Sequence, residues 1–584
     1  MTVTRSGDFS REMAVEHSSH TLIYAAVLGG LMLYFLSVYL CSVFPHYPLP
    51  SETVIYVYRQ DRWLLLAGTG LLLIAGFGLG GRTQKLQCST ASLAAIAIGV
   101  ICFCRLGYSW ILCGFDLSRD EQLANFDSQI FRSGHLVRHL PAAWQSHAEA
   151  LNTLFMLPAA HPIAWVSAYL PMNALLRSVV GLAGDPALTS PLMVALGMFA
   201  LWKCARILWP EDREAAVVAV LLYIGSGQIL FTGMTAYAMT AHLALNLLWL
   251  WFFLLDRRGT DGAALLVGFL ATGLHQPVFH PLFAAPILFT LLLDRNWPRV
   301  IVYAAGYAAI CAFWLAWPIW MHSLVARAPS VAAAAGTDYF SRLSGTVTKG
   351  DPLRWLEMAA NLLRFCAWQH MLMVPFILAA IPAIRKDRLA AVLAVSLLLP
   401  VGVMTLIMPY QGYGFGYRYL HGVLGPAILL AVFGWRQLVI TRSWLRPLLL
   451  RTSALGLFVL MPLQGAMAYS FYAPYAQVER RIDASGADYF IAGWEDAPGA
   501  REFVFNRPDL SNRPIRLLSE NVDGPLIRNI CHRGIRVAMP TSALLFPIES
   551  YLAVPYAPEA DDQIVTFSHR LTAAGCMLRR LDTP

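Results

Sequence analysis

A series of long apolar runs constrains the fold of this chain more than any other feature. The first, "TLIYAAVLGGLMLYFLSVYLCSVF" at residues 21–44, is long enough to cross a bilayer, since one helical span needs about 20 apolar residues. It is longer than a signal-peptide core and lacks a small-residue cleavage site, so we expect a retained anchor. Charged residues make up only 13% of the chain and hydrophobic residues 57%. The sequence therefore predicts a polytopic α-helical membrane protein.

About thirteen runs are expected to span the membrane. They begin near residues 21, 63, 89, 189, 213, 236, 262, 281, 299, 358, 389, 419 and 449. With a cytoplasmic N-terminus, the connections expected inside are basic, for example "DRRGTD" at 256–261 and "RKDR" at 385–388. Because cytoplasmic loops are rich in Lys and Arg, this pattern places residues 470–584 outside. It also accounts for the net charge of +8, which gives no reason to expect a nucleic-acid partner.

The runs divide the chain into four predicted parts. These are a cytoplasmic tail (1–20), a transmembrane hairpin (21–88), a transmembrane module (89–469) with large outside loops at 114–188 and 318–357, and an extracytoplasmic domain (470–584). The last part contains the β-like runs "DYFIAG", "REFVF", "IRLLS" and "IRVAM", a pattern typical of a small α/β domain. Cys531 and Cys576 lie in this part and could pair in an oxidising compartment.

An acidic cluster follows the third run, at the start of the first outside loop. Asp120 and Glu121 come directly after Arg119, and apolar residues recur at helical spacing over 123–140. A carboxylate partly out of water at a membrane surface can have its basicity tuned for catalysis. The alternative is a capping role, because acidic residues favour helix N-termini. The apolar spacing predicts an amphipathic helix lying on the membrane surface.

Two further polar clusters are expected at the same membrane face. In "GLHQPVFHP", the side chains of His275, Gln276 and His280 could bind a phosphate, hydrogen-bond a sugar or ligate a metal, or simply satisfy a helix break. In "MPYQGYGFGYRYLHG", Arg418 stands among tyrosines and glycines, which suits a phosphate group or an interfacial anchor. Tyr237, in "FTGMTAYAMTAH", could face the same region.

The order of these features resembles the GT-C superfamily of membrane glycosyltransferases, which includes protein O-mannosyltransferases and the aminoarabinose transferases of lipid A. The resemblance rests on "RDE" at 119–121, on "YLPMNALL" at 169–176 and on the run at 184–259. It implies a polyprenyl-phosphate-linked sugar donor, an extracytoplasmic acceptor and a multi-pass protein of the cell (inner) membrane in contact with membrane lipid. The acidic loop follows the third span instead of the first, so an N-terminal hairpin is added here.

The resemblance also implies roles for particular residues. Asp120 would be the catalytic base of an inverting transfer, and Glu121 a second acidic or positioning residue beside it. The expected substrate-binding and phosphate-binding residues are Arg418, His275, Gln276, His280, Tyr237, Tyr417 and Arg119. No metal ligands are assigned, because "FTGMTAY" lacks the acidic residue that many members carry in this loop. A divalent metal ion is the one cofactor left open.

Two other classes of function are compatible with a chain of this kind. A transporter or flippase of a lipid-linked saccharide would place charges near mid-membrane, often in two related halves. Here the charges gather at one face and no internal repeat is visible. A ligase or polymerase of surface polysaccharide would share the many spans and the outside arginine, but would not need the "RDE" loop.

Overall fold

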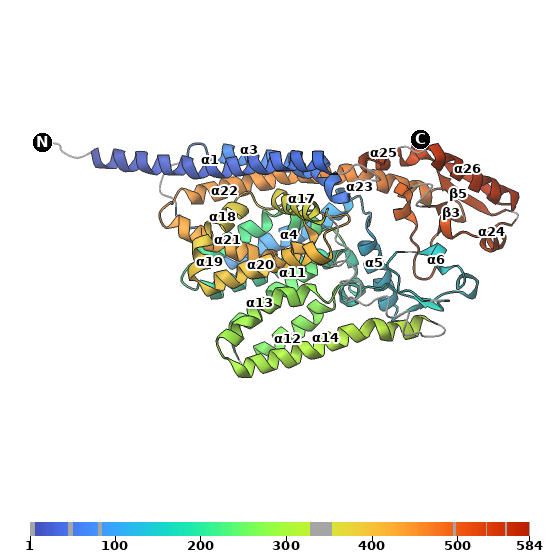
Figure 1. Cartoon of the computed structure of the whole chain (residues 1–584), viewed down its shortest axis with the longest axis horizontal. Coiled ribbons are helices and arrows are strands. Elements are labelled where there is room, and N and C mark those ends of the chain that lie inside the picture. Colours follow the sequence, from blue (N-terminus) through green and yellow to red (C-terminus); the bar gives the residue numbers. More distant parts are fainter. Residues whose placement is uncertain are drawn as a thin grey trace.

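The computed structural model of the chain is a helical bundle with a small α/β domain at one end of its long axis (Figure 1). α1 (Ser6–Val43) runs along one side of the bundle beside α3 (Arg62–Ala75) (Figure 1). The structure describes residues 6–44, 51–79, 84–152, 154–159, 161–257, 259–326, 353–493, 498–532, 534–554 and 558–582. Most of the outside loop expected at 318–357 therefore lies outside the described residues, and α14 continues to Val325.

The other helices of the bundle follow the apolar runs closely. They are α2 (Glu52–Tyr56), α4 (Thr90–Trp110), α8 (Thr189–Leu208), α9 (Arg213–Ile224), α10 (Gly227–Thr232), α11 (Met239–Leu255), α12 (Thr260–Thr272), α13 (Phe279–Leu293), α14 (Trp297–Val325), α17 (Arg354–Ala367), α18 (Met373–Ala379), α19 (Ile381–Lys386), α20 (Arg388–Ile407), α21 (Leu424–Val439), α22 (Leu445–Leu455) and α23 (Met461–Asp483). Within the described ranges, seven helical stretches are long and apolar enough to cross a membrane, and four apolar helices are shorter. The polytopic helical fold is confirmed, but the number of thirteen spans is not.

The surface of α1 shows that the bundle is built for lipid. Its outward apolar side chains are more than half exposed: Tyr24, Leu28, Met32, Phe35 and Tyr39. Such a continuous apolar face is stable only against hydrocarbon. The inner face packs tightly on α3, since a Cβ at Gly30 would lie 2.2 Å from Thr69 Oγ1. The N-terminal hairpin is thus packed into the membrane part of the molecule.

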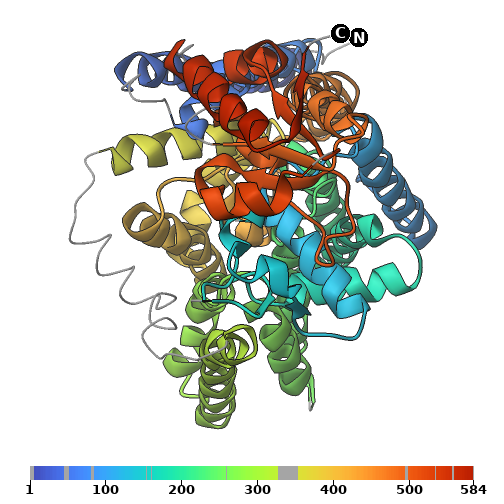
Figure 2. The ribbon, with the colours of Figure 1, turned by 90° about the vertical axis from the view of Figure 1, so that its right-hand side faces the viewer.

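The segment predicted as the first outside loop folds into α5 (Arg119–Arg132), α6 (Ala148–Leu151), α7 (Met172–Leu182) and the antiparallel pair β1 (Arg138–His139) and β2 (Ala164–Trp165). The helix predicted after the acidic cluster is present as α5. Its expected position with the apolar face on the membrane surface is wrong. Phe126 instead packs edge-on against Trp165, at 5.1 Å between ring centroids, and against Phe505, at 5.8 Å. The C-terminal domain, remote in sequence, covers this face (Figure 2).

The C-terminal domain is a four-stranded parallel sheet in the order β4-β3-β5-β6. Its elements are β3 (Tyr489–Ala492), β4 (Ile515–Leu518), α24 (Gly524–Ile530), β5 (Arg536–Pro540), α25 (Ser542–Tyr551), α26 (Pro558–Ala573) and β6 (Met577–Leu581). Three of the four predicted strands are confirmed. The strand predicted at "REFVF" is wrong, because this segment contributes to a 3-10 helix (Pro498–Phe503). Its carbonyl groups at Arg501 and Val504 accept hydrogen bonds from Arg119 rather than from a strand.

A disulfide between Cys531 and Cys576 joins the end of α24 to the start of β6. Since it closes a loop with a sequence separation of 45, replacing both cysteines by serine should lower the stability of this domain by about 2–5 kcal/mol. Thermal unfolding of the purified protein, followed by protease sensitivity of residues 484–582, would measure this. A domain equally stable with both serines, or a thiol reagent that labels both native cysteines without reduction, would contradict the bond.

Candidate active site

Asp120 lies in the first turn of α5, where the helix start is fixed by a capping box. Ser118 accepts a hydrogen bond from the backbone N–H of Glu121, and the Glu121 carboxylate accepts one from the N–H of Ser118. The other Glu121 oxygen accepts the N–H of Ala236, at 3.3 Å. Burial, together with the nearby Asp116 carboxylate, raises the pKa of Glu121 to about 8. Glu121 therefore ties α5 to the loop before α11 and does not share the surroundings of Asp120.

Asp120 and Arg418 form an ion pair between segments 298 residues apart in the chain. Arg418 Nη1 donates to Asp120 Oδ2 at 2.8 Å, and the hydroxyl of Tyr169 donates to Oδ1 at 2.5 Å. Only 6% of the Arg418 side chain and 16% of the Asp120 side chain are exposed. Burial opposes ionisation of Asp120 most strongly, but the Arg418 guanidinium, the nearby His275 and the hydrogen bond from Tyr169 together hold the pKa of this carboxyl below its usual range. The carboxylate is thus charged, with both oxygens engaged.

The glycine-rich segment before Arg418 makes room for that side chain. Gly414 has φ of +150°, and a Cβ there would lie 2.4 Å from Arg418 Cδ. Gln411 accepts the backbone N–H of Arg418, at 2.9 Å, which fixes the start of the short helix Arg418–Val423. The guanidinium lies over the ring of Tyr237, at 4.8 Å from its centroid. Gly414 therefore makes room for the arginine, and the Tyr237 face adds a cation–π contact.

Two small cavities flank this ion pair, and Met239 lines both of them. The first, which we call the carboxylate cavity, is lined by Asp120 and by Asp127, Ser167, Tyr169, Asn173 and His275 among others. The second, which we call the arginine cavity, is lined by Arg418 and by His242, Asn246, Phe279, Leu282, Pro400, Tyr419 and Gly422 among others. The pair thus lies between a cavity lined by carboxylates and a cavity in which, among the described residues, the Arg418 guanidinium is the one charged lining group.

Of the residues predicted for the site, four come together: Asp120, Arg418, Tyr237 and His275. The ring of His275 lies 4.2 Å from that of Tyr169, the residue that hydrogen-bonds Asp120. Its neighbour Gln276 is half-buried, outside the residues that line either cavity.

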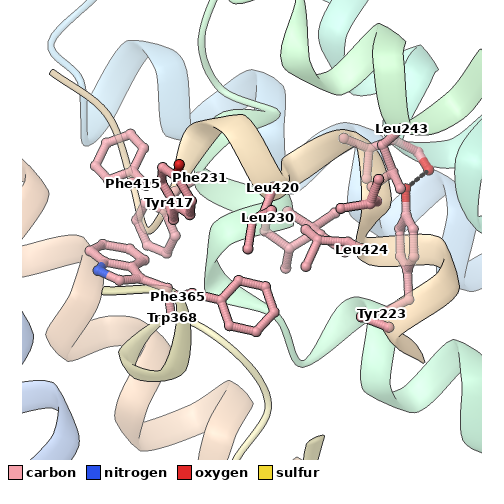
Figure 3. Packing of buried hydrophobic residues seen from close by; sticks show 14 of the residues in the cluster. Tyr223, Leu230, Phe231, Leu243, Phe365, Trp368, Phe415, Tyr417, Leu420 and Leu424 are labelled. Atoms are coloured by element: carbon pink, nitrogen blue, oxygen red, sulfur yellow. Dashed lines mark hydrogen bonds between the residues drawn. The ribbon is translucent and has the colours of Figure 1, made fainter. Parts of the chain in front are cut away.

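The other predicted binding residues have structural surroundings. His280 is hydrogen-bonded to Asn246 and Tyr307, both at 2.7 Å. Tyr417 is fully buried in the hydrophobic core beside Phe415 and Phe231 (Figure 3).

Arg119 turns toward the C-terminal domain instead of the cavities. Its guanidinium donates to the carbonyl oxygens of Val504 and Arg501, at 2.9 and 2.6 Å. The Glu502 carboxylate lies 3.8 Å away. Arg119 therefore joins α5 to the domain that covers it, although it is the immediate neighbour of Asp120 in sequence.

Sequence reasoning missed four polar residues of the carboxylate cavity: Tyr169, Asn173, Asp127 and Ser167. Tyr169 and Asn173 belong to "YLPMNALL", which carried the family resemblance but no assigned role. Asp127 lies seven residues, or about two helical turns, beyond Asp120 on α5, and this spacing was the available signal. It accepts hydrogen bonds from the backbone N–H and the hydroxyl of Ser167, at 3.1 and 2.5 Å.

Among the described residues, no group of three or more His, Cys, Asp or Glu side chains is placed to hold a metal ion. The two histidines that suggested a metal, His275 and His280, have separate surroundings: the ring of His275 packs at a tilt against Tyr169, and His280 is hydrogen-bonded to Tyr307. The chemistry available at the ion pair is that of a carboxylate beside a fixed guanidinium: proton acceptance on one side and anion binding on the other.

No known protein family and no curated protein matches the sequence. Among solved structures, a crystal structure of ArnT from Cupriavidus metallidurans bound to undecaprenyl phosphate aligns with 82% of this chain and 91% of that chain, at 13% identity and a TM-score of 0.49. The apo state of ArnT from the same organism aligns with 82% and 90%, at 12% identity and a TM-score of 0.46. At this level of similarity, function has to be argued from the side chains of this chain.

Burial raises the pKa of Asp127 to about 7, from an ordinary value of 3.8. Between these two pH values the Asp127 carboxyl keeps its proton in the folded protein but releases it in the unfolded chain. The stability that the protonated carboxyl contributes is therefore complete below about pH 4 and is lost as pH rises through about 7. Asp127→Asn cannot ionise, so its melting temperature relative to wild type should rise across that range. Melting curves at pH 5 and pH 8 measure the difference. A difference that does not change with pH would contradict the shift.

Proposed function

We propose that this protein is a membrane glycosyltransferase that moves a sugar from a polyprenyl-phosphate donor to an extracytoplasmic acceptor, with inversion. The observation that carries the proposal is the buried Asp120–Arg418 ion pair, with a cavity on each side. A base for the acceptor and a cation for the leaving phosphate are the two groups that such a transfer needs. The GT-C resemblance of the sequence, which assigns the same two residues to these roles, supports the proposal.

The reaction uses each group once. The acceptor's hydroxyl oxygen attacks the anomeric carbon of the sugar from the face opposite the phosphate. As the new bond between acceptor oxygen and sugar carbon forms, the bond between that carbon and the phosphate oxygen breaks. The acceptor's proton passes to the Asp120 carboxylate, and polyprenyl phosphate leaves with the bonding electrons, its added charge balanced by Arg418. Tyr169 and Tyr237 keep the carboxylate and the guanidinium in place.

Ion pairs between helix ends support one orientation for the whole bundle. Arg299 at the start of α14 pairs with Asp256 and Asp261, and Arg388 at the start of α20 pairs with Asp294. Further pairs, Arg436–Asp212 and Arg446–Glu214, join α21 and α22 to the start of α9. The basic loops thus gather at shared helix ends, which we assign to the cytoplasm. The reaction centre would then face outside.

Asp120→Asn keeps the size of the side chain but cannot accept a proton. Turnover by the purified protein should therefore fall by about 10²–10⁴, with normal insertion. Glu121→Gln should cost less, because Glu121 positions the helix. Asp185→Asn is the matched control, since Asp185 also pairs with an arginine, Arg105, but outside both cavities. Near-normal turnover of Asp120→Asn at normal abundance would refute its role as base.

The orientation can be tested with reporters of known sidedness. Alkaline phosphatase fused at the C-terminus, beyond β6, should be active, because the enzyme folds only in an oxidising compartment. The same reporter inserted between α11 and α12, next to Gly259, should be inactive, because we assign that loop to the cytoplasm. A fluorescent protein that matures only in the cytoplasm should give the opposite pair of results. Activity of alkaline phosphatase at Gly259 alone would reverse the topology and remove the reaction centre from the outside face.

A further inference from the structure

His242, on α11, is a buried group that no part of the reaction above uses. It is 3% exposed, it lines the arginine cavity, and neither of its ring nitrogens has a hydrogen-bond partner among the described residues. Nε of Arg418, which lines the same cavity, is also without a partner. Buried polar groups are nearly always paired in folded proteins, so two such groups at one cavity indicate a site for a ligand.

The other walls of this cavity define the chemistry of that ligand. Asn246 is already engaged: its amide nitrogen donates to the carbonyl oxygen of Gly422, and its amide oxygen is hydrogen-bonded to His280. No carboxylate among the described residues lines the cavity, so its free polar groups are a cation and an imidazole. Phe279 and Leu282 supply apolar wall beside them. A phosphate group attached to an apolar chain fits this combination.

Resting on the function proposed above, we propose that the donor's phosphate binds between His242 and Arg418 and takes Arg418 away from Asp120. In the structure both oxygens of Asp120 are engaged, by Arg418 and by Tyr169. A phosphate that competes for the guanidinium releases one of these oxygens and removes the charge that holds the carboxylate weakly basic. The base therefore becomes available only when the donor is in place.

The two small cavities are consistent with this exchange. Met239 is part of the wall of each, so the two cavities are neighbours, and a shift of Arg418 toward His242 keeps the guanidinium at the arginine cavity that it already lines. A protein without donor keeps its base masked. Water that enters the carboxylate cavity is then not activated before the sugar and acceptor are present.

The test is the affinity of the purified protein, in lipid nanodiscs, for undecaprenyl phosphate. Asp120→Asn removes the competing charge, so binding should tighten by about tenfold or more, even though turnover falls. His242→Phe keeps a ring but loses both nitrogens, so binding should weaken by about tenfold or more. His322→Phe is the matched control: His322 is also 3% exposed with an unpartnered Nε2, but lines neither cavity, and affinity should not change.

Two further ligands identify the source of the phosphate. Inorganic phosphate and vesicles of phosphatidylglycerol, at the same phosphate concentration, should compete only weakly with undecaprenyl phosphate for the site. If either competed as well as undecaprenyl phosphate itself, the proposed selectivity for the lipid carrier would be overturned. Unchanged or weaker binding by Asp120→Asn would overturn the exchange, and Asp120→Ala gives an independent reading if the first variant is poorly folded. If Asp120→Asn binds more tightly but the wild-type protein itself transfers no sugar from the donor, the proposed function is refuted and the phosphate site stands.

Discussion

The rest of the structure depends on one costly interaction, the ion pair between Asp120 and Arg418. Moving two charges out of water costs several kcal/mol for each ion, and their attraction repays this only with good geometry and further hydrogen bonds. The pair has both: a contact of 2.8 Å, a hydroxyl from Tyr169 and the face of Tyr237. An apolar pair of similar size would serve stability as well. We therefore attribute the presence of these charges to the proposed reaction.

Much of the surrounding structure serves to hold the two charged side chains in position against each other. α5 carries Asp120, and its start is fixed by Glu121 on one side and by Arg119 on the other. The described part of the C-terminal domain packs on the apolar face of the same helix, and none of its described side chains lines either cavity. Gly414 allows the backbone to approach the stem of Arg418. The C-terminal domain thereby helps to hold the candidate site in place.

The sequence predicted the helices well because their length and apolarity are local properties. It also indicated Asp120 and Arg418, since charges are conspicuous at the ends of apolar runs. The residues alone could not separate Asp120 from Glu121, and their different roles came from the family resemblance. Adjacent residues on a helix point about 100° apart, and only the tertiary partners decide which one caps. Tyr169 was missed because a single tyrosine in an apolar segment carries no local signal. "REFVF" has a strand-like pattern, but its carbonyl groups are taken by Arg119, which is distant in sequence.

The central claim is that Asp120 and Arg418 act as one unit in the chemical step. A double-mutant cycle on kcat, with Asp120→Asn, Arg418→Gln and both together in the purified protein, tests it most directly. Because residues that act in one step are strongly non-additive, the double variant should be no slower than Asp120→Asn alone. Losses that multiply, or a double variant with near-normal kcat, would contradict the account.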